Sequence, residues 1–232
     1  MLERVINLIG EEKVNKIKQA NICVFGLGGV GGYVVEALVR SGVNNITIID
    51  NDTVKLSNIN RQLIATYDSI DKLKTDVWVE RIKLINPNCN VIAYPMFFTK
   101  DTEFDVEKYD YIIDCIDTVS AKLELVKRCK NTGVNIITCL GTGNKLDPSK
   151  IKITDISKTS VCPLARVMRY ELRKMGINHV DVLFSTEEPL KPLEVIEECG
   201  RHAPASMVFV PSCAGIMIAS YVIRKIIGVE NE

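Results

Sequence analysis

The stretch Ile22-Cys23-Val24-Phe25-Gly26-Leu27-Gly28-Gly29-Val30-Gly31 joins a short apolar run directly to a cluster of glycines. The apolar part is long enough for a buried parallel strand. After the glycines, residues 30–41 carry apolar side chains at helical spacing, and residues 46–49 form a second apolar run. Strand, glycine turn, helix and strand in this order predict a βαβ unit.

The glycine cluster itself predicts a nucleotide-binding turn. Gly26, Gly28 and Gly31 match the pattern G-x-G-x-x-G, with Gly29 as an additional glycine, between a strand and a helix. Glycines lack Cβ atoms, so the backbone can approach phosphate oxygens closely, and the N-terminus of the helix favours an anion. Tight packing between strand and helix would select glycine too, so the pattern depends on further residues for its interpretation.

Downstream of this unit, strand and helix patterns continue to alternate. This predicts an α/β, Rossmann-like fold with a mainly parallel sheet, helices on both faces and a variable C-terminal third. We expect one domain over 1–232, with a nucleotide-binding core over 1–147 and a substrate-side extension with a final helix over 148–232. Expected helices are 3–18, 72–85, 121–130, 163–175 and 211–228; expected strands are 91–94, 111–113, 134–138, 150–153 and 182–184; 187–205 is expected to be an exposed or mobile loop.

Composition excludes several classes of protein. Of the 232 residues 47% are apolar, and 29 basic residues balance 29 acidic ones, so a uniformly basic nucleic-acid coat is excluded. Two histidines, and eight cysteines without a C-x-x-C pair, argue against His-rich sites and zinc ribbons. The N-terminus has no signal-peptide pattern, and the uncharged stretch 207–223 is interpreted as a core helix rather than a membrane span. We therefore expect a cytoplasmic protein with buried, reduced cysteines.

Polar residues after the second strand narrow the choice of nucleotide chemistry. Asp50 lies 19 residues after Gly31, where a carboxylate can accept hydrogen bonds from the ribose of NAD, FAD or ATP. Asn58 and Arg61 are three residues apart, and Lys74 follows 13 residues later. Two fixed cations near a phosphate chain suit phosphoryl or nucleotidyl transfer. Alone, each of these cations would more simply be a solvated surface residue.

Asp117 follows the strand predicted at 111–113, where the carboxyl ends of strands bind ligands in open α/β sheets. A carboxylate there can hold Mg²⁺ against nucleotide phosphates. The alternative role is that of N-cap for the next helix, and Asp114 is the alternative metal ligand.

Taken together, these motifs resemble the adenylation domain of the ubiquitin-activating-enzyme-like superfamily, which uses Mg-ATP to adenylate a carboxylate. The resemblance implies that the four glycines, Asp50 and Asp52 hold ATP and that Asp117 coordinates Mg²⁺. It implies that Asn58, Arg61, Gln62 and Lys74 line the phosphates, with Arg61, Lys74 and Asp117 as catalytic residues. In this superfamily an arginine near the N-terminus, sometimes from a partner subunit, also contacts the phosphates, and Arg4 is the candidate here.

Within the superfamily, the chain resembles the tRNA threonylcarbamoyladenosine dehydratases. The similarity covers about residues 3–228 and is carried by the segments 141–148, 155–159, 163–165, 184–187 and 211–215; Cys162 departs from the acidic residue expected before Pro163. The implied reaction activates the threonine carboxylate of a modified tRNA adenosine as an acyl-adenylate, after which a carbamoyl nitrogen closes a ring and expels AMP. ATP, Mg²⁺, tRNA and a homodimer are implied, with a monovalent cation and a sulfur-transfer protein as further expectations.

Two other functions remain open on these residues. The first is an adenylyltransferase that activates the C-terminus of a ubiquitin-like sulfur-carrier protein, although such enzymes commonly carry C-x-x-C pairs that this chain lacks. The second is a non-catalytic dinucleotide-binding or interaction module.

A candidate tRNA surface lies on the helix predicted at 163–175. Arg166, Arg169 and Arg173 recur at i, i+3 and i+7 beside Tyr170, which places three guanidinium groups on one helical stripe. A solvated helix face would show the same spacing.

Overall fold

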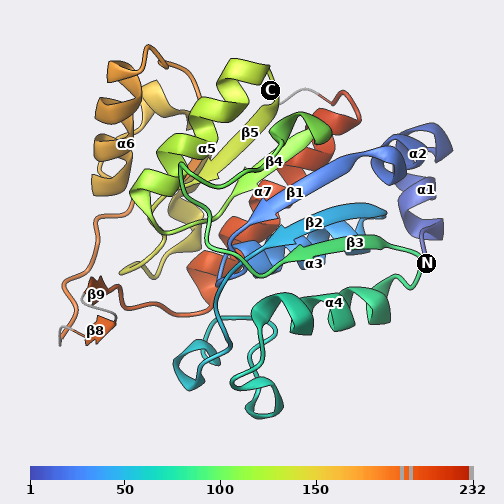
Figure 1. Cartoon of the computed structure of the whole chain (residues 1–232), viewed down its shortest axis with the longest axis horizontal. Coiled ribbons are helices and arrows are strands. Elements are labelled where there is room, and N and C mark those ends of the chain that lie inside the picture. The colour runs from blue at the N-terminus through green and yellow to red at the C-terminus, as the bar shows by residue number, and fades with distance from the viewer. Residues whose placement is uncertain (194–195, 199–200, 230–232) are drawn as a thin grey trace.

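A seven-stranded sheet in the order β3-β2-β1-β4-β5-β7-β6 forms the centre of the molecule (Figure 1). The structure is a computed structural model that describes residues 1–193, 196–198 and 201–229. All neighbouring strands are parallel except β6, which is antiparallel to β7, so the predicted mainly parallel α/β fold is confirmed. The strands are β1 Asn21–Phe25, β2 Asn45–Ile49, β3 Asn90–Tyr94, β4 Tyr111–Asp114, β5 Asn135–Cys139, β6 Ile151–Asp155 and β7 Asp181–Ser185.

Helices cover both faces of this sheet, and alternate residues of each inner strand enter different cores. Ile22 and Val24 of β1 pack in a core with residues of α3, α4 and α7, whereas Cys23 and Phe25 pack with residues of α5 and α6. Burial on both faces explains why the four residues of β1 after the exposed Asn21 are all apolar. The helices are α1 Glu3–Ile9, α2 Glu11–Gln19, α3 Gly31–Arg40, α4 Lys74–Ile85, α5 Val119–Thr132, α6 Pro163–Lys174 and α7 Phe209–Ile226.

The order in which the chain adds strands to the sheet reverses between β1 and β4, although the two strands themselves are parallel. From β1 the chain proceeds outward to β2 and β3, and it then returns to β4 on the other side of β1. In open α/β sheets the loops at such a switch point separate and leave a binding crevice at the carboxyl ends of the strands. The glycine turn follows β1 at this point, which predicts where a ligand binds.

Two predicted elements differ from the structure. The helix expected over 3–18 is two helices, because Gly10 between them adopts a φ of 83° that a helix does not allow. Leu8 is 83% exposed, whereas Val14 and Ile17 of the second helix are buried. The loop expected over 187–205 contains a short antiparallel pair, β8 Ile196–Glu198 with β9 Arg201–Ala203, whose strands are too short to show an alternating pattern.

The final helix α7 is long and apolar enough to span a membrane by length and composition. In the structure it packs against α3, and a Cβ atom on Gly215 would come within 2.5 Å of the Val30 carbonyl oxygen. Such close approach of two helices requires glycine at this position. The structure therefore places α7 in the core of the domain, as predicted from its sequence.

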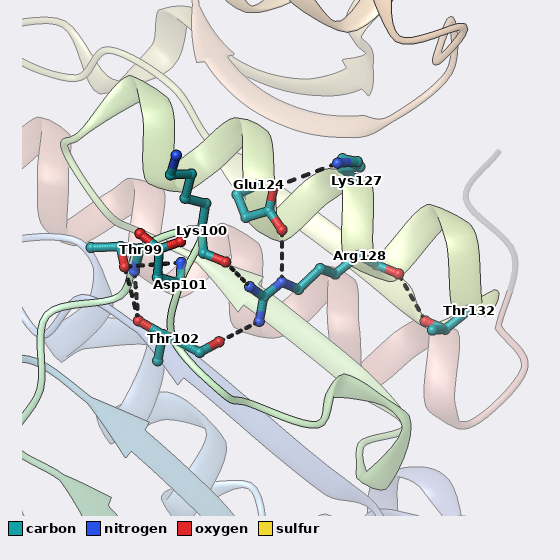
Figure 2. Close-up of polar contacts among 8 residues, drawn as sticks. All are labelled: Thr99, Lys100, Asp101, Thr102, Glu124, Lys127, Arg128 and Thr132. Atoms are coloured by element: carbon teal, nitrogen blue, oxygen red, sulfur yellow. Dashed lines mark hydrogen bonds and ion pairs between the residues drawn. The ribbon is translucent and has the colours of Figure 1, made fainter.

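Arg128 fastens the connection between β3 and β4 to α5 (Figure 2). Its Nη1 donates to the Thr102 carbonyl at 2.7 Å, its Nη2 to the Lys100 carbonyl at 2.7 Å, and its Nε to Glu124 at 2.8 Å. The guanidinium also lies over the Phe98 ring, 5.1 Å from its centroid. Every nitrogen of this arginine is used within the fold, which identifies a structural role.

Candidate functional site

In the turn after β1, Gly26 and Gly31 are in close contact with neighbouring backbone, whereas the space beside Gly28 is open. A Cβ on Gly31 would lie 1.8 Å from the Gly26 carbonyl oxygen, and one on Gly26 would lie 2.6 Å from the Cys115 carbonyl oxygen. These two positions therefore need glycine for contact within the turn and with the loop after β4. At Gly28 a Cβ would meet nothing closer than 3.9 Å, the distance to Gln62 Nε2. The backbone at Gly28 is thus open to a ligand, as phosphate binding requires.

Asp50, at the end of β2, holds the turn. Its Oδ2 accepts the Leu27 N–H at 2.6 Å and its Oδ1 accepts the Asp52 N–H at 2.8 Å. Burial raises the pKa of the Asp50 carboxyl, while the ammonium of Lys74 and the two backbone bonds act in the opposite direction. A carboxylate has about four acceptor positions, so Asp50 keeps the capacity to accept from a ribose.

Lys74 is buried at the first residue of α4, with only 4% of the residue exposed. Its Nζ lies 2.8 Å from Asp52 Oδ2 and 3.9 Å from Asp50 Oδ1. The alternative interpretation of Lys74 as a solvated surface cation is therefore wrong. Asp52 serves as its counter-ion, a role that the sequence did not reveal.

Arg61 lies against the glycine turn. Its Cγ is 3.5 Å from the position that a Cβ on Gly29 would occupy. Its Nη1 donates to the Ser57 carbonyl at 2.7 Å and to Asn60 Oδ1 at 2.9 Å. Within the described residues, Nε and Nη2 have no hydrogen-bond partner. One edge of the guanidinium is therefore held by the protein, and the other keeps the two-pronged geometry that binds phosphate.

Asn58 and Gln62 are both buried, but they differ in what their side chains do. Asn58 Oδ1 accepts the Lys55 N–H at 3.2 Å, and its carbonyl accepts the Arg61 and Gln62 N–H groups, so Asn58 shapes the turn that carries Arg61. Gln62 Oε1 is buried without a hydrogen-bond partner among the described residues. An unsatisfied buried amide beside Gly28 is the kind of group that a bound ligand satisfies.

Asp117 and Asp114 have different environments in the loop after β4. Asp114 is fully buried and lies 2.9 Å from Lys122 Nζ, so the alternative assignment of Asp114 as a metal ligand is wrong. Asp117 is exposed and, among the described residues, accepts only from Thr118 Oγ1, at 3.2 Å. The N-cap of α5 is Thr118, so the alternative role of Asp117 as the cap is wrong too.

The described residues contain no cluster of three or more His, Cys, Asp or Glu side chains that would hold a metal ion. A single exposed carboxylate nevertheless suits Mg²⁺, which keeps several waters and takes substrate phosphates as ligands. Asp117 therefore fits a metal that arrives with a nucleotide.

Lys122 is a residue that sequence reasoning missed. Its Nζ donates to Asp114 at 2.9 Å and to the Cys139 carbonyl at 2.7 Å, which ties the ends of β4 and β5 together. Burial raises the pKa of the Asp114 carboxyl, and the ammonium of Lys122 opposes that shift. Lys122 precedes Leu125, Val126 and Cys129 by three, four and seven residues, so it lies on the same buried stripe of α5 as they do. This helical spacing is the sequence pattern from which a buried lysine could have been predicted.

Arg4 does not join the site of its own chain. It is exposed on α1, which lies at the amino ends of the strands, opposite the glycine turn (Figure 1). Leu2 confirms this location, since its Cδ1 would be 2.9 Å from a Cβ on Gly42, shortly before β2 begins. A cavity of about 590 Å³ between α2, α7 and the first residues of β1 and β5 lies at the same edge, away from the site.

The arginines of α6 do not form one free stripe. Arg169 donates through Nη1 to the carbonyl and the hydroxyl of Thr159, so it fastens the loop before α6. Arg166 and Arg173 are exposed, and Tyr170 between them is 62% exposed with Lys174 Nζ 4.1 Å from its ring centroid. The predicted surface is therefore reduced to Arg166, Arg173 and their aromatic neighbour.

Two cysteines near the site, Cys115 and Cys139, are not activated thiols. Burial raises the pKa of Cys115, and it raises the pKa of Cys139 to about 12. Cys162, the departure noted before Pro163, is buried, while Cys213 is partly exposed on α7. Cys199 lies outside the described residues. A thiolate nucleophile needs a lowered pKa, which neither Cys115 nor Cys139 has.

Comparison with known proteins gives one family. The model described as the ThiF family matches residues 2–232. The tRNA threonylcarbamoyladenosine dehydratase of Bacillus subtilis (strain 168) is 40% identical over 232 residues, which cover 94% of this chain and 91% of that protein. The protein of the same name from Escherichia coli (strain K12) is 38% identical and covers 85% and 78%, respectively.

Solved structures give the same result. The structure of E. coli tRNA N6-threonylcarbamoyladenosine dehydratase in complex with ATP matches with a TM-score of 0.87 at 34% identity, over 97% of this chain and 93% of that one. Its complex with AMP gives the same values. By contrast, an adenylyltransferase and sulfurtransferase of Vanderwaltozyma polyspora matches only 59% of this chain and 31% of its own length.

Proposed function

Because the chain belongs to the ThiF family, we propose that it is an ATP-dependent tRNA threonylcarbamoyladenosine dehydratase. The extent of the similarity carries this proposal. The Bacillus dehydratase matches 94% of the chain, which includes most of the C-terminal third, whereas the adenylyltransferase of Vanderwaltozyma polyspora matches 59%. The C-terminal third is where enzymes of one nucleotide-binding fold differ in substrate, because function resides in sites added to the fold.

The proposed reaction has two steps. A carboxylate oxygen of the threonine attacks the α-phosphorus of ATP, so a C–O–P link forms and pyrophosphate leaves. The neighbouring carbamoyl nitrogen then attacks the acyl carbon, loses its proton, and AMP leaves with the oxygen it gained, so the substrate has lost one water. Both partners of the second step lie in one molecule, so proximity supplies much of the rate. No enzyme thiol is needed, in agreement with the raised pKa values of Cys115 and Cys139.

The residues of the site would divide this work. Gly28 and its neighbours would present backbone N–H groups to the phosphates, and Asp50 would accept hydrogen bonds from the ribose. Arg61 and Lys74 would stabilise the charge that develops on the phosphates as the link to pyrophosphate breaks. Asn58 and Asp52 would hold Arg61 and Lys74 in place, and Gln62 would bind the nucleotide with its unsatisfied amide.

Asp117 would hold Mg²⁺, which when bound neutralises charge on phosphate oxygens. We expect Asp117→Asn to raise the Mg²⁺ concentration for half-maximal turnover by about tenfold, because an amide lacks the charge that attracts the ion. Turnover is measured across a magnesium titration at saturating ATP. Asp101→Asn, at an exposed aspartate in the loop fastened by Arg128, is the matched control. An unchanged titration curve for Asp117→Asn would exclude this role.

The tRNA would approach across α6. We expect the double variant Arg166→Glu and Arg173→Glu to weaken tRNA binding by about tenfold or more, and to reduce the slope of log affinity against log salt by about two. Binding of ATP should stay unchanged, because both residues lie outside the nucleotide site. Filter binding at several salt concentrations measures both quantities.

The control for this experiment is Lys108→Glu with Lys130→Glu, which changes the charge equally at exposed positions elsewhere. Arg169 is left intact because it fastens the loop at Thr159. If the α6 variant binds tRNA as tightly as the control variant does, tRNA binds elsewhere on the protein.

The proposed function is tested directly by mass spectrometry of tRNA nucleosides. Purified protein with Mg-ATP should convert threonylcarbamoyladenosine in tRNA to a product lighter by one water, with one AMP released, and should leave tRNA that lacks this nucleoside unchanged. Pyrophosphate exchange that instead depends on a small protein ending in Gly-Gly would indicate a sulfur-carrier adenylyltransferase. Absence of any turnover would indicate a binding module.

Further proposals follow from the resemblance. A homodimer would allow Arg4 of a second copy to approach the phosphates, which Arg4 of the same chain does not. The protein is proposed to act in the cytoplasm on tRNA. A monovalent-cation requirement and a sulfur-transfer partner stay predictions.

A further inference from the structure

Asn60 connects the phosphate-facing Arg61 to a segment from the far end of the chain. Its Oδ1 accepts from Arg61 Nη1 at 2.9 Å, and its Nδ2 donates to the Ser206 carbonyl at 2.9 Å. Asn60 is itself exposed, so neither bond is a by-product of packing in the core. Both polar ends of one amide are thereby used, and Asn60 connects Arg61 to Ser206, which lies 146 positions after Asn60 in the chain.

The segment Pro204–Met207, which we call the bridging segment, is held at its other side by the loop after β5. Ala205 N–H donates to Asn144 Oδ1 at 2.8 Å, and Asn144 N–H donates to the Ala205 carbonyl at 2.7 Å. A Cβ on Gly143 would lie 2.6 Å from Pro204 Cβ, so the loop and the segment are in close contact. The bridging segment therefore has fixed anchors on both sides of Ser206.

The same segment leads directly into α7, whose first turn lies at the glycine turn. Pro211 Cβ would be 3.3 Å from a Cβ on Gly29, the glycine beside which the Arg61 side chain also lies. The Ser206 carbonyl is thus fixed by Asn144 on one side and by the packing of α7 on the other. An acceptor fixed in this way can hold the Asn60 amide in one orientation.

We propose that Asn60 is a positioning residue that orients the Arg61 guanidinium toward the phosphates by anchoring it to the bridging segment. This inference rests on the proposed function, in which Arg61 contacts ATP. A partly exposed arginine samples many rotamers, and fixing it before the nucleotide binds removes that entropic cost from the binding step. Because Asn60 and Ser57 both use Nη1, Nε and Nη2 stay available for an anion.

The test compares the affinities for ATP and for adenosine in the wild type, Asn60→Ala and Asn88→Ala. Asn88 is an exposed asparagine between α4 and β3 and is the matched control. We expect Asn60→Ala to bind ATP about tenfold more weakly and adenosine within about twofold of the wild type, because Arg61 acts on phosphates only. Asn88→Ala should bind both ligands as the wild type does. Equal losses for both ligands would mean that Asn60 only stabilises the fold, and would overturn the proposal.

A double-mutant cycle with Arg61→Ala separates this proposal from the proposed function. If Asn60 acts through Arg61, then Asn60→Ala should have no further effect on ATP affinity once Arg61 is alanine. Additive losses would overturn the positioning role. If Arg61 does not contact ATP, which is the part of the proposed function that this inference needs, the result is different: Arg61→Ala alone would then bind ATP and adenosine as the wild type does.

Discussion

Replacing Arg61 with alanine should lower the rate of tRNA dehydration by about 10²- to 10³-fold at saturating ATP and Mg²⁺. The Arg61 side chain lies against the glycine turn with its Nη1 bound to Ser57 and Asn60, and its Nε and Nη2 have no hydrogen-bond partner among the described residues. Donors fixed before the reaction stabilise developing phosphate charge without reorganising, which is why removal of one is so costly. The rate is measured as dehydrated nucleoside formed per unit time by mass spectrometry, with AMP release as a second readout.

Arg40→Ala is the control for this prediction. Arg40 is an exposed arginine at the end of α3 remote from the glycine turn, and it is paired with Glu36 in the preceding turn of the helix. We expect its loss to change turnover by less than about twofold, since Glu36 keeps its ion pair with Arg81 at 2.7 Å when Arg40 is removed. An Arg61→Ala enzyme that retains more than about a third of wild-type turnover would contradict the assignment of Arg61 as a catalytic residue.

The second large effect is expected on stability. Lys122→Met should lower the free energy of unfolding by about 3 to 5 kcal/mol, because it leaves the fully buried Asp114 carboxylate without its counter-ion. The change also removes the hydrogen bond to the Cys139 carbonyl, so the ends of β4 and β5 lose a common anchor. Urea unfolding followed by circular dichroism measures the difference.

The loss in free energy of unfolding caused by Lys122→Met should increase as the pH rises. Burial raises the pKa of Asp114 in the folded protein, and the loss of Lys122 removes the largest interaction that opposes that shift. Below the ordinary aspartate pKa of about 4, the carboxyl is protonated in both folded and unfolded chains, so the penalty is smallest there. It should grow as the pH rises toward the raised pKa of the folded state.

Removing both charges should recover part of the lost stability. The double variant Asp114→Asn with Lys122→Met has no buried charge, and its amide oxygen can still accept the Ile116 N–H that Asp114 now accepts at 3.0 Å. A single variant Lys122→Met within about 1 kcal/mol of the wild type at neutral pH would show that the pair contributes little. So would a penalty that falls as the pH rises.

Local sequence was sufficient for the βαβ unit and for the glycine turn. The apolar run before Gly26 reads as a strand because both of its faces are buried, and Gly26 and Gly31 are needed by contacts with neighbouring backbone atoms. Asp50 was likewise predicted from its spacing from that turn, whereas Lys74 was predicted from its position after Arg61 and from the family resemblance. Residues near one another in sequence and attached to the same strand or helix have positions that the local conformation already restricts.

Contacts between distant segments decided the remaining assignments. Which of Asp114 and Asp117 is free depended on Lys122, which comes from the next helix, and the role of Arg169 depended on Thr159 in the preceding loop. The orientation of Arg61 depends on Asn60 and through it on Ser206, 146 residues away. The residue type determines which hydrogen bonds and ion pairs a side chain can make. Only the tertiary structure determines which of its donors and acceptors already have partners within the protein, because those partners come from other segments of the chain.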